Sequence, residues 1–307
     1  MILSIIVPCY NEQEVLHIFY NELIINILKI TNDYEIIFVN DGSKDNTIKE
    51  CLKLKEKDNK ISIIDFSRNF GKEAAIYAGL KESKGEYVVT MDADLQDPPF
   101  LLEQMYNQLQ DNNLDNIATF RVNRKGEPKI RSFFARCFYR LINKMIDVEI
   151  VDGARDYRMM KRKMVDAILE LQEYHRFSKG IFAWVGFNTK YIDYENVERA
   201  AGETKWSFWK LFKYAVEGII AFTTLPLRIA TVVGVTISIF GFIYMLYIAI
   251  KAMLFGDPVS GFPSLIVIIT LLGGMQLLFL GIIGEYLARN YMETKKRPIY
   301  IVKNKYQ

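Results

Sequence analysis

The sequence predicts an α/β domain with a mostly parallel sheet, followed by an interfacial helix and a two-helix transmembrane hairpin. Two observations support this prediction. Short β-branched and aromatic runs alternate with helical stretches over roughly the first 200 residues, which is the pattern of βαβ units. Two later runs, residues 229–250 and 262–284, contain no charged residue over 22 and 23 positions, so each is long enough to cross a bilayer.

Strands and helices can be assigned along the first part of the chain. The expected strands are residues 3–7, 34–39, 61–66, 86–91 and 116–120, and the expected helices are residues 14–30, 72–81 and 99–110. Another helix is expected to begin near Asp45, whose side chain suits an N-cap. Strands joined by helices in this way form a parallel sheet that is covered on both faces.

Composition and charge argue against several protein classes. The 307 residues are 50% hydrophobic and carry a net charge of +3, so no nucleic-acid partner is expected. The widely spaced Cys9, Cys51 and Cys137 match neither a disulfide framework nor a zinc site, which favours a reducing compartment. Because neither G-x-G-x-x-G nor G-x-x-x-x-G-K-[ST] follows the first strand, a dinucleotide fold of the usual type and a P-loop are not expected.

The chain is expected to divide into four parts. These are a soluble domain, an interfacial segment, a transmembrane hairpin and a cytoplasmic tail, at residues 1–204, 205–228, 229–288 and 289–307, with spans at about 229–252 and 262–286. Aromatic and lysine residues interleave over residues 205–214, as in helices that lie in the headgroup layer. A helix packed on the soluble domain is the alternative for this segment.

Basic residues flank the hairpin on its outer sides. They are Lys205, Lys210, Lys213 and Arg228 before the first span, and Arg289, Lys295, Lys296 and Arg297 after the second. By the positive-inside rule, both termini and the soluble domain are cytoplasmic. Closely spaced glycines in the second span would let helices approach one another, so we expect a homo-oligomer, although glycine is also common in membrane helices without that role.

Polar residues directly follow three of the expected strands, at residues 10–12, 40–43 and 92–97. Each cluster alone reads as a turn rich in Asn, Asp and Gly. Because the carboxyl ends of parallel strands meet at one edge of a sheet, we expect the three clusters to converge on a ligand site. In the third cluster, Asp92, Asp94 and Gln96 supply hard oxygen ligands, which suit Mg²⁺ or Mn²⁺ shared with substrate phosphates.

The three clusters together resemble the inverting glycosyltransferases of family 2, which have the GT-A fold. The sequences are V-P-C-Y-N-E at 7–12, V-N-D-G-S at 39–43 and D-A-D-L-Q at 92–96. The chain looks most like the polyprenyl-phosphate branch, which includes dolichol-phosphate mannose synthases and bactoprenol glucosyltransferases. Further matches cover essentially the whole chain: R-N-F-G-K-E at 68–73, G-x-T-K-W at 202–206, T-T-L-P-L-R at 223–228, G-E-Y-L-A-R at 284–289 and R-P-x-Y at 297–300.

The resemblance implies a role for each matching residue. A nucleotide sugar would be held by Pro8, Tyr10, Glu12 and Asp41, with Ser43 and Lys72 near the nucleotide. Asp92, Asp94 and Gln96 would bind the metal and the diphosphate, with Asp94 counted among the catalytic residues. Asp156 would face the donor sugar as a further catalytic residue, and Arg121 and Arg131 would receive the phosphate of the lipid acceptor.

The implied reaction is inverting transfer of a hexose to a polyprenyl phosphate. The donor expected is UDP-glucose and the acceptor undecaprenyl phosphate, at the cytoplasmic face of a bacterial cytoplasmic membrane, for modification of a surface glycan. Mannose from GDP-mannose, galactose or an aminosugar remain alternatives, because the loops that distinguish these enzymes cannot be aligned from one sequence.

Three other functions are less well supported. A processive polysaccharide synthase needs a Q-x-x-R-W motif. The most similar segment, residues 172–177, has the wrong spacing and no tryptophan. A non-catalytic scaffold is disfavoured because all the acidic motif residues are present. A transporter is disfavoured because two spans without a charge offer no pathway through the membrane.

Overall fold

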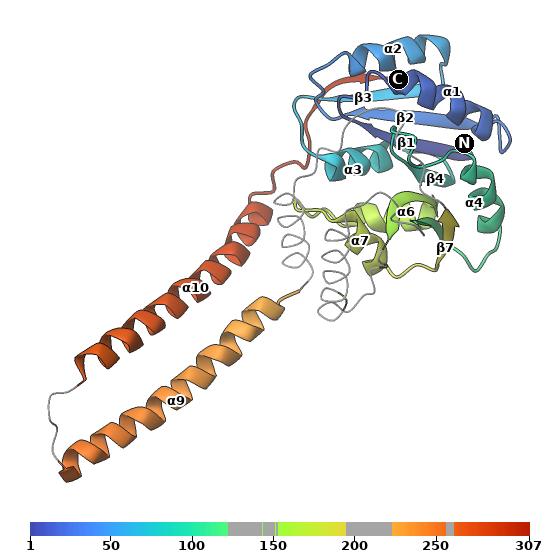
Figure 1. The fold of residues 1–307 in the computed structure, drawn as a ribbon. Helices are drawn as coiled ribbons and strands as arrows, with labels where there is room; N and C mark the ends of the chain where they lie inside the picture. Colours follow the sequence, from blue (N-terminus) through green and yellow to red (C-terminus); the bar gives the residue numbers. More distant parts are fainter. Residues whose placement is uncertain (122–142, 144–150, 152, 195–222, 256–260) are drawn as a thin grey trace. The chain divides into compact units, whose positions relative to one another are not determined.

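The structure, a computed structural model, describes residues 1–121, 143, 151, 153–194, 223–255 and 261–307. The chain divides into two units. Residues Met1–Ala215 and Arg297–Gln307 form a sheet domain, and residues Val216–Lys296 form a helical unit (Figure 1).

The sheet domain alternates strands and helices for most of its length. In chain order its elements are β1 (Leu3–Cys9), α1 (Leu16–Ile27), β2 (Tyr34–Asn40), α2 (Thr47–Lys57), β3 (Ile61–Phe66), α3 (Lys72–Glu82), β4 (Tyr87–Thr90), α4 (Leu101–Leu109), β5 (Asn116–Arg121), β6 (Ala154–Lys161), α6 (Arg162–Glu170), α7 (Ser178–Trp184), β7 (Thr189–Tyr194) and β8 (Val302–Tyr306).

The strands form one eight-stranded sheet in the order β7-β5-β6-β4-β1-β2-β3-β8. The strands β4, β1, β2 and β3 are parallel neighbours, which confirms the mostly parallel sheet. β6 runs antiparallel between β4 and β5, and β8 runs antiparallel along β3. The first residues of β6 therefore reach the same edge of the sheet as the last residues of β4, although the two segments are far apart in the sequence.

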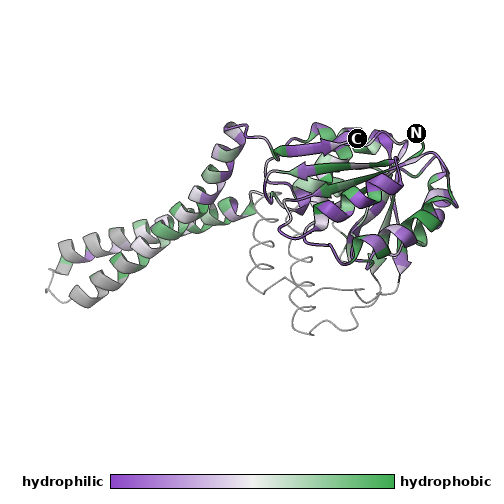
Figure 2. Cartoon of the chain, turned by 90° about the horizontal axis from the view of Figure 1, so that it is seen from above, coloured by the Kyte–Doolittle hydropathy of each residue, from purple (hydrophilic) through white to green (hydrophobic). Residues whose placement is uncertain are grey.

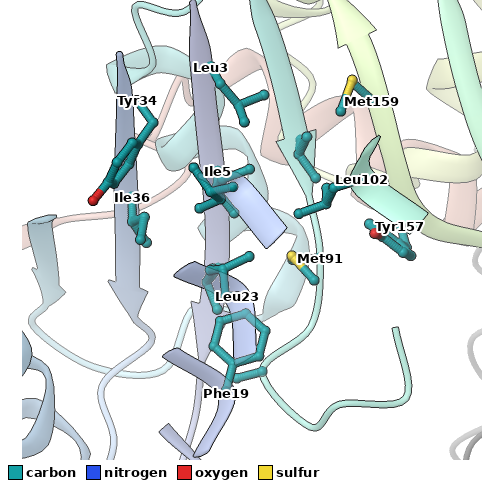
Figure 3. Packing of buried hydrophobic residues seen from close by; sticks show 14 of the residues in the cluster. Leu3, Ile5, Phe19, Leu23, Tyr34, Ile36, Met91, Leu102, Tyr157 and Met159 are labelled. Carbon is teal, nitrogen blue, oxygen red and sulfur yellow. The ribbon is translucent and has the colours of Figure 1, made fainter. Parts of the chain in front are cut away.

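Both faces of the parallel strands are buried, and β2 illustrates the alternation. Ile36 and Phe38 belong to the core that includes α1 and α4, part of which is shown in Figure 3. Ile37 and Val39 point to the opposite face, where they pack against alanines of α3. Side chains on a strand alternate between faces, so a strand buried on both sides reads as a continuous apolar run.

The last residues of the chain form a strand that the sequence did not predict. β8 pairs with β3 from Ile63↔Tyr306 to Phe66↔Val302. Just before β8, the ring of Tyr300 stacks on Phe66 with 4.9 Å between ring centroids. The segment expected to be only a tail thus covers the edge of β3, which would otherwise leave backbone N–H and C=O groups unpaired.

The helical unit contains two long apolar helices, α9 (Leu225–Phe255) and α10 (Phe262–Thr294). They include the two expected spans, and both are long and apolar enough to cross a membrane. Figure 2 shows hydrophobic residues along their described parts. Within this unit the hydroxyl of Tyr286 donates a hydrogen bond of 2.7 Å to the carbonyl of Thr223, which joins the end of α10 to the start of α9. The expected interfacial residues 205–214 lie outside the described residues.

Candidate active site

The loops after β1 and β2 are joined by reciprocal hydrogen bonds. The backbone N–H of Asn11 donates to Ser43 Oγ at 3.0 Å, and the N–H of Lys44 donates to Asn11 Oδ1 at 2.8 Å. Asp45 is not the N-cap that the sequence predicted, because α2 is preceded by Asn46; Asp45 instead accepts from the N–H of Thr47 at 3.0 Å. The first two polar clusters therefore lie side by side, and Ser43 helps to hold them together.

Asp41 anchors the loop that precedes α3. Its carboxylate accepts hydrogen bonds from the N–H groups of Phe70 at 2.6 Å and Gly71 at 3.0 Å, and the residue is 3% exposed. Burial raises the pKa of Asp41, while the two N–H groups oppose that rise. Asp41 thus holds Phe70 and Gly71 at the carboxyl edge of the sheet, and contact with a nucleotide stays a prediction for this residue.

Gly42 allows this loop to approach β2. Its φ is +63°, and a Cβ atom there would lie 2.3 Å from the carbonyl carbon of Arg68. We expect Gly42→Ala to destabilise the domain by about 1–3 kcal/mol, as overpacking does. Gly186→Ala is the matched control, because Gly186 also has a positive φ, of +71°, but an added Cβ would meet only a carbonyl oxygen at 3.9 Å. Thermal unfolding of both variants in detergent tests this; equal losses would contradict the close approach.

The loop after β4 is held by its last aspartate. Asp97 is 1% exposed, accepts from the N–H of Asp92 at 3.1 Å and pairs with Arg155 Nη2 at 3.3 Å. The hydroxyl of Tyr157 also donates to the carbonyl of Pro98 at 3.1 Å. Asp97 therefore has a structural role, and contact of Asp92 and Asp94 with a ligand stays a prediction.

Lys72, at the first position of α3, connects two of the predicted site residues. Its ammonium lies 2.8 Å from Asp92 Oδ1 and 2.9 Å from Asp156 Oδ2. Asp156 is at the start of β6 and reaches this edge because β6 is antiparallel to β4; its carbonyl accepts from Thr90 Oγ1 at 2.5 Å. The structure thus brings together residues that are 20 and 84 positions from Lys72 in the sequence.

Lys72 and Asp156 stabilise each other in their charged forms. Burial would raise the pKa of Asp156, but the charges of Lys72 and then Lys179 hold it well below its usual range. Burial would lower the pKa of Lys72, but Asp156 and Asp92 hold it above its usual range. Lys72 and Asp156 are therefore both charged at neutral pH.

A cavity of about 340 Å³ adjoins this cluster. Its lining consists of the start of α3 with the loop before it, the segment before α7, and Ile299: Arg68, Asn69, Phe70, Gly71, Lys72, Glu73, Ala74, Tyr174, His175, Arg176 and Ile299. Glu73 accepts hydrogen bonds from both the backbone N–H of Ser178, at 2.9 Å, and its hydroxyl. Burial and the charge of Asp156 raise the pKa of Glu73 to about 7.

The raised pKa of Glu73 predicts a pH-dependent stability. Between its ordinary value of 4.5 and about 7, the native state holds a proton that the unfolded state has lost, so stability falls as pH rises through this window. We expect Glu73→Gln to remove this pH dependence. The difference in thermal midpoint, variant minus wild type, should therefore increase as pH rises from 5 to 7.5. A difference that does not change with pH would contradict the raised pKa. The charges that act on Glu73 are Asp156, which raises the pKa, and Lys72, which lowers it.

The donor set after β4 fits a divalent cation that is shared with a substrate. Asp92, Asp94 and Gln96 would offer side-chain oxygens as ligands, and the backbone N–H of Gln96 donates to Asp94 Oδ1 at 3.1 Å. Within the described residues, no three His, Cys, Asp or Glu side chains could hold a metal ion together. Two carboxylates are the usual protein contribution for Mg²⁺, which retains waters and substrate phosphates as its other ligands.

The remaining predicted residues differ in what the structure says of them. Pro8 lies in β1, and Tyr10 and Glu12 follow that strand at the site edge. Arg121 ends β5, where it is in register with Tyr194. Arg131 lies outside the described residues. Local sequence pattern predicts no role for Glu73, Lys179 or Arg155, because their partners are distant in the sequence.

Acidic side chains and a lysine thus gather at the carboxyl edge of the parallel strands, which is where open α/β sheets bind ligands. The chain belongs to glycosyl transferase family 2, whose family model matches residues 4–169. A relative from Shigella phage SfV, the bactoprenol glucosyl transferase, is 39% identical over 307 residues and covers 100% of both chains. A glycosyltransferase of Synechocystis sp. (strain ATCC 27184 / PCC 6803 / Kazusa), named as uncharacterized, is 43% identical over 302 residues, with 98% of this chain and 94% of the relative covered.

The fold is also that of a solved glycosyltransferase. The structure of the mannosyltransferase PcManGT from Pyrobaculum calidifontis, in complex with GDP-Man and Mn²⁺, has a TM-score of 0.50 and 18% identity, and the match covers 71% of this chain and 63% of that one. The sheet domain therefore has the GT-A fold, as expected from the strand-end motifs.

Proposed function

We propose that this protein transfers glucose from UDP-glucose to undecaprenyl phosphate, with inversion, at the cytoplasmic face of a bacterial membrane, for modification of a surface glycan. The observation that carries the proposal is the similarity over the full length, helical unit included, to the bactoprenol glucosyl transferase of Shigella phage SfV. The two apolar helices would anchor the enzyme in the membrane, where its lipid acceptor resides. By the positive-inside rule, the basic residues near the outer ends of the hairpin would put both termini in the cytoplasm.

In the proposed reaction, a phosphate oxygen of the acceptor attacks the anomeric carbon, and the bond from that carbon to the nucleoside diphosphate breaks. Mg²⁺ or Mn²⁺ bound at Asp92, Asp94 and Gln96 would neutralise charge that develops on the diphosphate. Lys72, from α3, would supply a further positive charge beside it. An α-linked donor gives a β-linked lipid product, because there is a single displacement.

Asp156 would stabilise positive charge at the anomeric centre and orient sugar hydroxyls. The acceptor is a phosphate monoester with a second pKa of about 6, so it is largely ionised and needs no strong base. The low pKa of Asp156 also makes its carboxylate a weak base but a persistent negative charge. The phosphate would be positioned by arginines, for which Arg121 and Arg131 are the candidates.

The proposal is tested with purified protein in detergent, undecaprenyl phosphate, Mg²⁺ or Mn²⁺ and a panel of radiolabelled nucleotide sugars. Label is counted in the extracted lipid, with Asp94→Ala as the blank and a chelator as a second control. We expect label from UDP-glucose that disappears in both controls and returns when metal is added in excess of the chelator. Label from GDP-mannose alone would change the sugar, and no label from any donor would contradict the proposed function.

A further inference from the structure

The segment before α7 is joined to α3 by two contacts that the proposed reaction does not use. Glu73 accepts from the N–H and the hydroxyl of Ser178, a buried residue 105 positions away. The guanidinium of Arg176 lies 4.4 Å from the centre of the Tyr77 ring, one turn further along α3. These contacts attach residues 176 and 178 to the helix that begins with Lys72.

This attachment also determines where Lys179 lies. Lys179 directly follows Ser178 in α7 and is close enough to Asp156 for its charge to lower the pKa of that carboxylate. α7 is supported from the other side by β6, where the guanidinium of Arg158 lies 3.7 Å from the centre of the Phe182 ring. Lys72 of α3 contacts Asp156 directly, Lys179 lies in the first turn of α7, and Glu73 joins these two helices at their first turns.

We propose that Glu73 is a positioning residue for sugar transfer, which acts through Ser178 to hold the first turn of α7, and with it Lys179, against the start of α3. The proposal rests on the proposed function for the identity of the reaction. Glu73 itself would touch neither substrate; it would fix the segment that lines the cavity next to Lys72 and Asp156. Since its pKa is about 7, Glu73 is partly protonated at neutral pH, and its role depends on an acceptor oxygen rather than on a full negative charge.

Replacing the carboxylate of Glu73 by an amide separates its acceptor oxygen from its negative charge. Glu73→Ala removes the acceptor and leaves the buried N–H of Ser178 without its partner, whereas Glu73→Gln retains an acceptor oxygen of the same reach. We expect Glu73→Ala to lower kcat by about ten- to a hundredfold, because small displacements of a site have effects of this order. The KM for UDP-glucose should change little, and Glu73→Gln should restore most of kcat.

Lys179→Ala, alone and combined with Glu73→Ala, provides a second kinetic test. If Glu73 acts through Lys179, then Lys179→Ala should itself lower kcat, and the double variant with Glu73→Ala should be no slower than the slower single variant. Glu103→Ala, at an exposed glutamate in the first turn of α4, is the control and should leave kcat unchanged. Normal kcat in Glu73→Ala, failure of Glu73→Gln to restore it, or multiplying losses in the double variant would each overturn the proposal.

Hydrogen exchange gives a readout that does not depend on activity. We expect faster amide exchange in a peptide spanning residues 174–184 for Glu73→Ala, and wild-type exchange there for Glu73→Gln, with peptides from β1 unchanged in both. Unaltered exchange in Glu73→Ala would overturn the proposal. If the wild type transfers no sugar from any donor, the proposed function fails, and this measurement still decides whether Glu73 fixes the segment.

Discussion

Replacing Asp156 with asparagine is expected to lower kcat by about 10²–10³-fold, the usual loss when a preorganised charge or donor is removed from an active site. The carboxylate lies 2.9 Å from the ammonium of Lys72 and is held ionised, so it presents a fixed negative charge where the anomeric centre would become positive. Asparagine has the same shape but no charge. The loss should therefore appear in kcat, measured by label transfer at saturating donor, with little change in folding.

Asp166→Asn is the matched control for this variant. Asp166 is an exposed aspartate on α6 that pairs with Arg162 at 4.0 Å, and surface pairs of this kind contribute little to stability. Its removal should leave kcat at the wild-type value. Near-normal turnover in Asp156→Asn would remove Asp156 from the catalytic residues.

Deleting residues 298–307 is expected to cost the sheet domain several kcal/mol of unfolding free energy and so to lower its thermal midpoint by about 10 °C. Each kcal/mol lost lowers the midpoint of a domain of this size by about 2–4 °C. The deletion removes β8 from the edge of β3 and the Tyr300 ring from Phe66. It also removes Ile299 from the cavity beside Lys72 and Glu73. We therefore expect loss of transfer activity at 37 °C and a tendency of the exposed β3 edge to aggregate.

Two point variants separate the ring from the strand. Tyr300→Ala should reproduce part of the loss of stability, because it removes the stacked ring while leaving β8 in place. Tyr300→Phe keeps the ring and should stay close to wild type. A truncated protein with the wild-type midpoint would show that the C-terminal segment is dispensable for the fold.

Much of the sheet domain could be predicted because its parallel strands carry a local signal. Residues 34–40 and 61–66 are nearly continuous apolar runs, since their side chains are buried on both faces. The carboxyl ends of such strands share one edge, so the clusters after β1, β2 and β4 could be expected to converge. Family motifs then supplied Lys72 and Asp156, which local pattern alone would not have joined.

The rest depended on pairings between distant segments. β6 reads A-R-D-Y-R-M-M-K, with charged residues among apolar ones, and its place between β4 and β5 is set by antiparallel pairing that no local pattern reports. β8 is mostly exposed and polar, V-K-N-K-Y, so it has no hydrophobic periodicity. Asp97 lies in the same polar cluster as Asp92 and Asp94, and its structural role follows from its contact with Arg155, 58 positions away.

The most direct test of the central proposal is the structure of the product. Unlabelled UDP-glucose and undecaprenyl phosphate would be converted on a preparative scale, and the lipid product examined by mass spectrometry and by the proton coupling at the anomeric carbon. We predict one added hexose, a β-glycosyl phosphate linkage and one UDP released for each lipid formed. An α-linked lipid product, or free glucose with UDP and unmodified lipid, would contradict single-displacement transfer to the lipid phosphate.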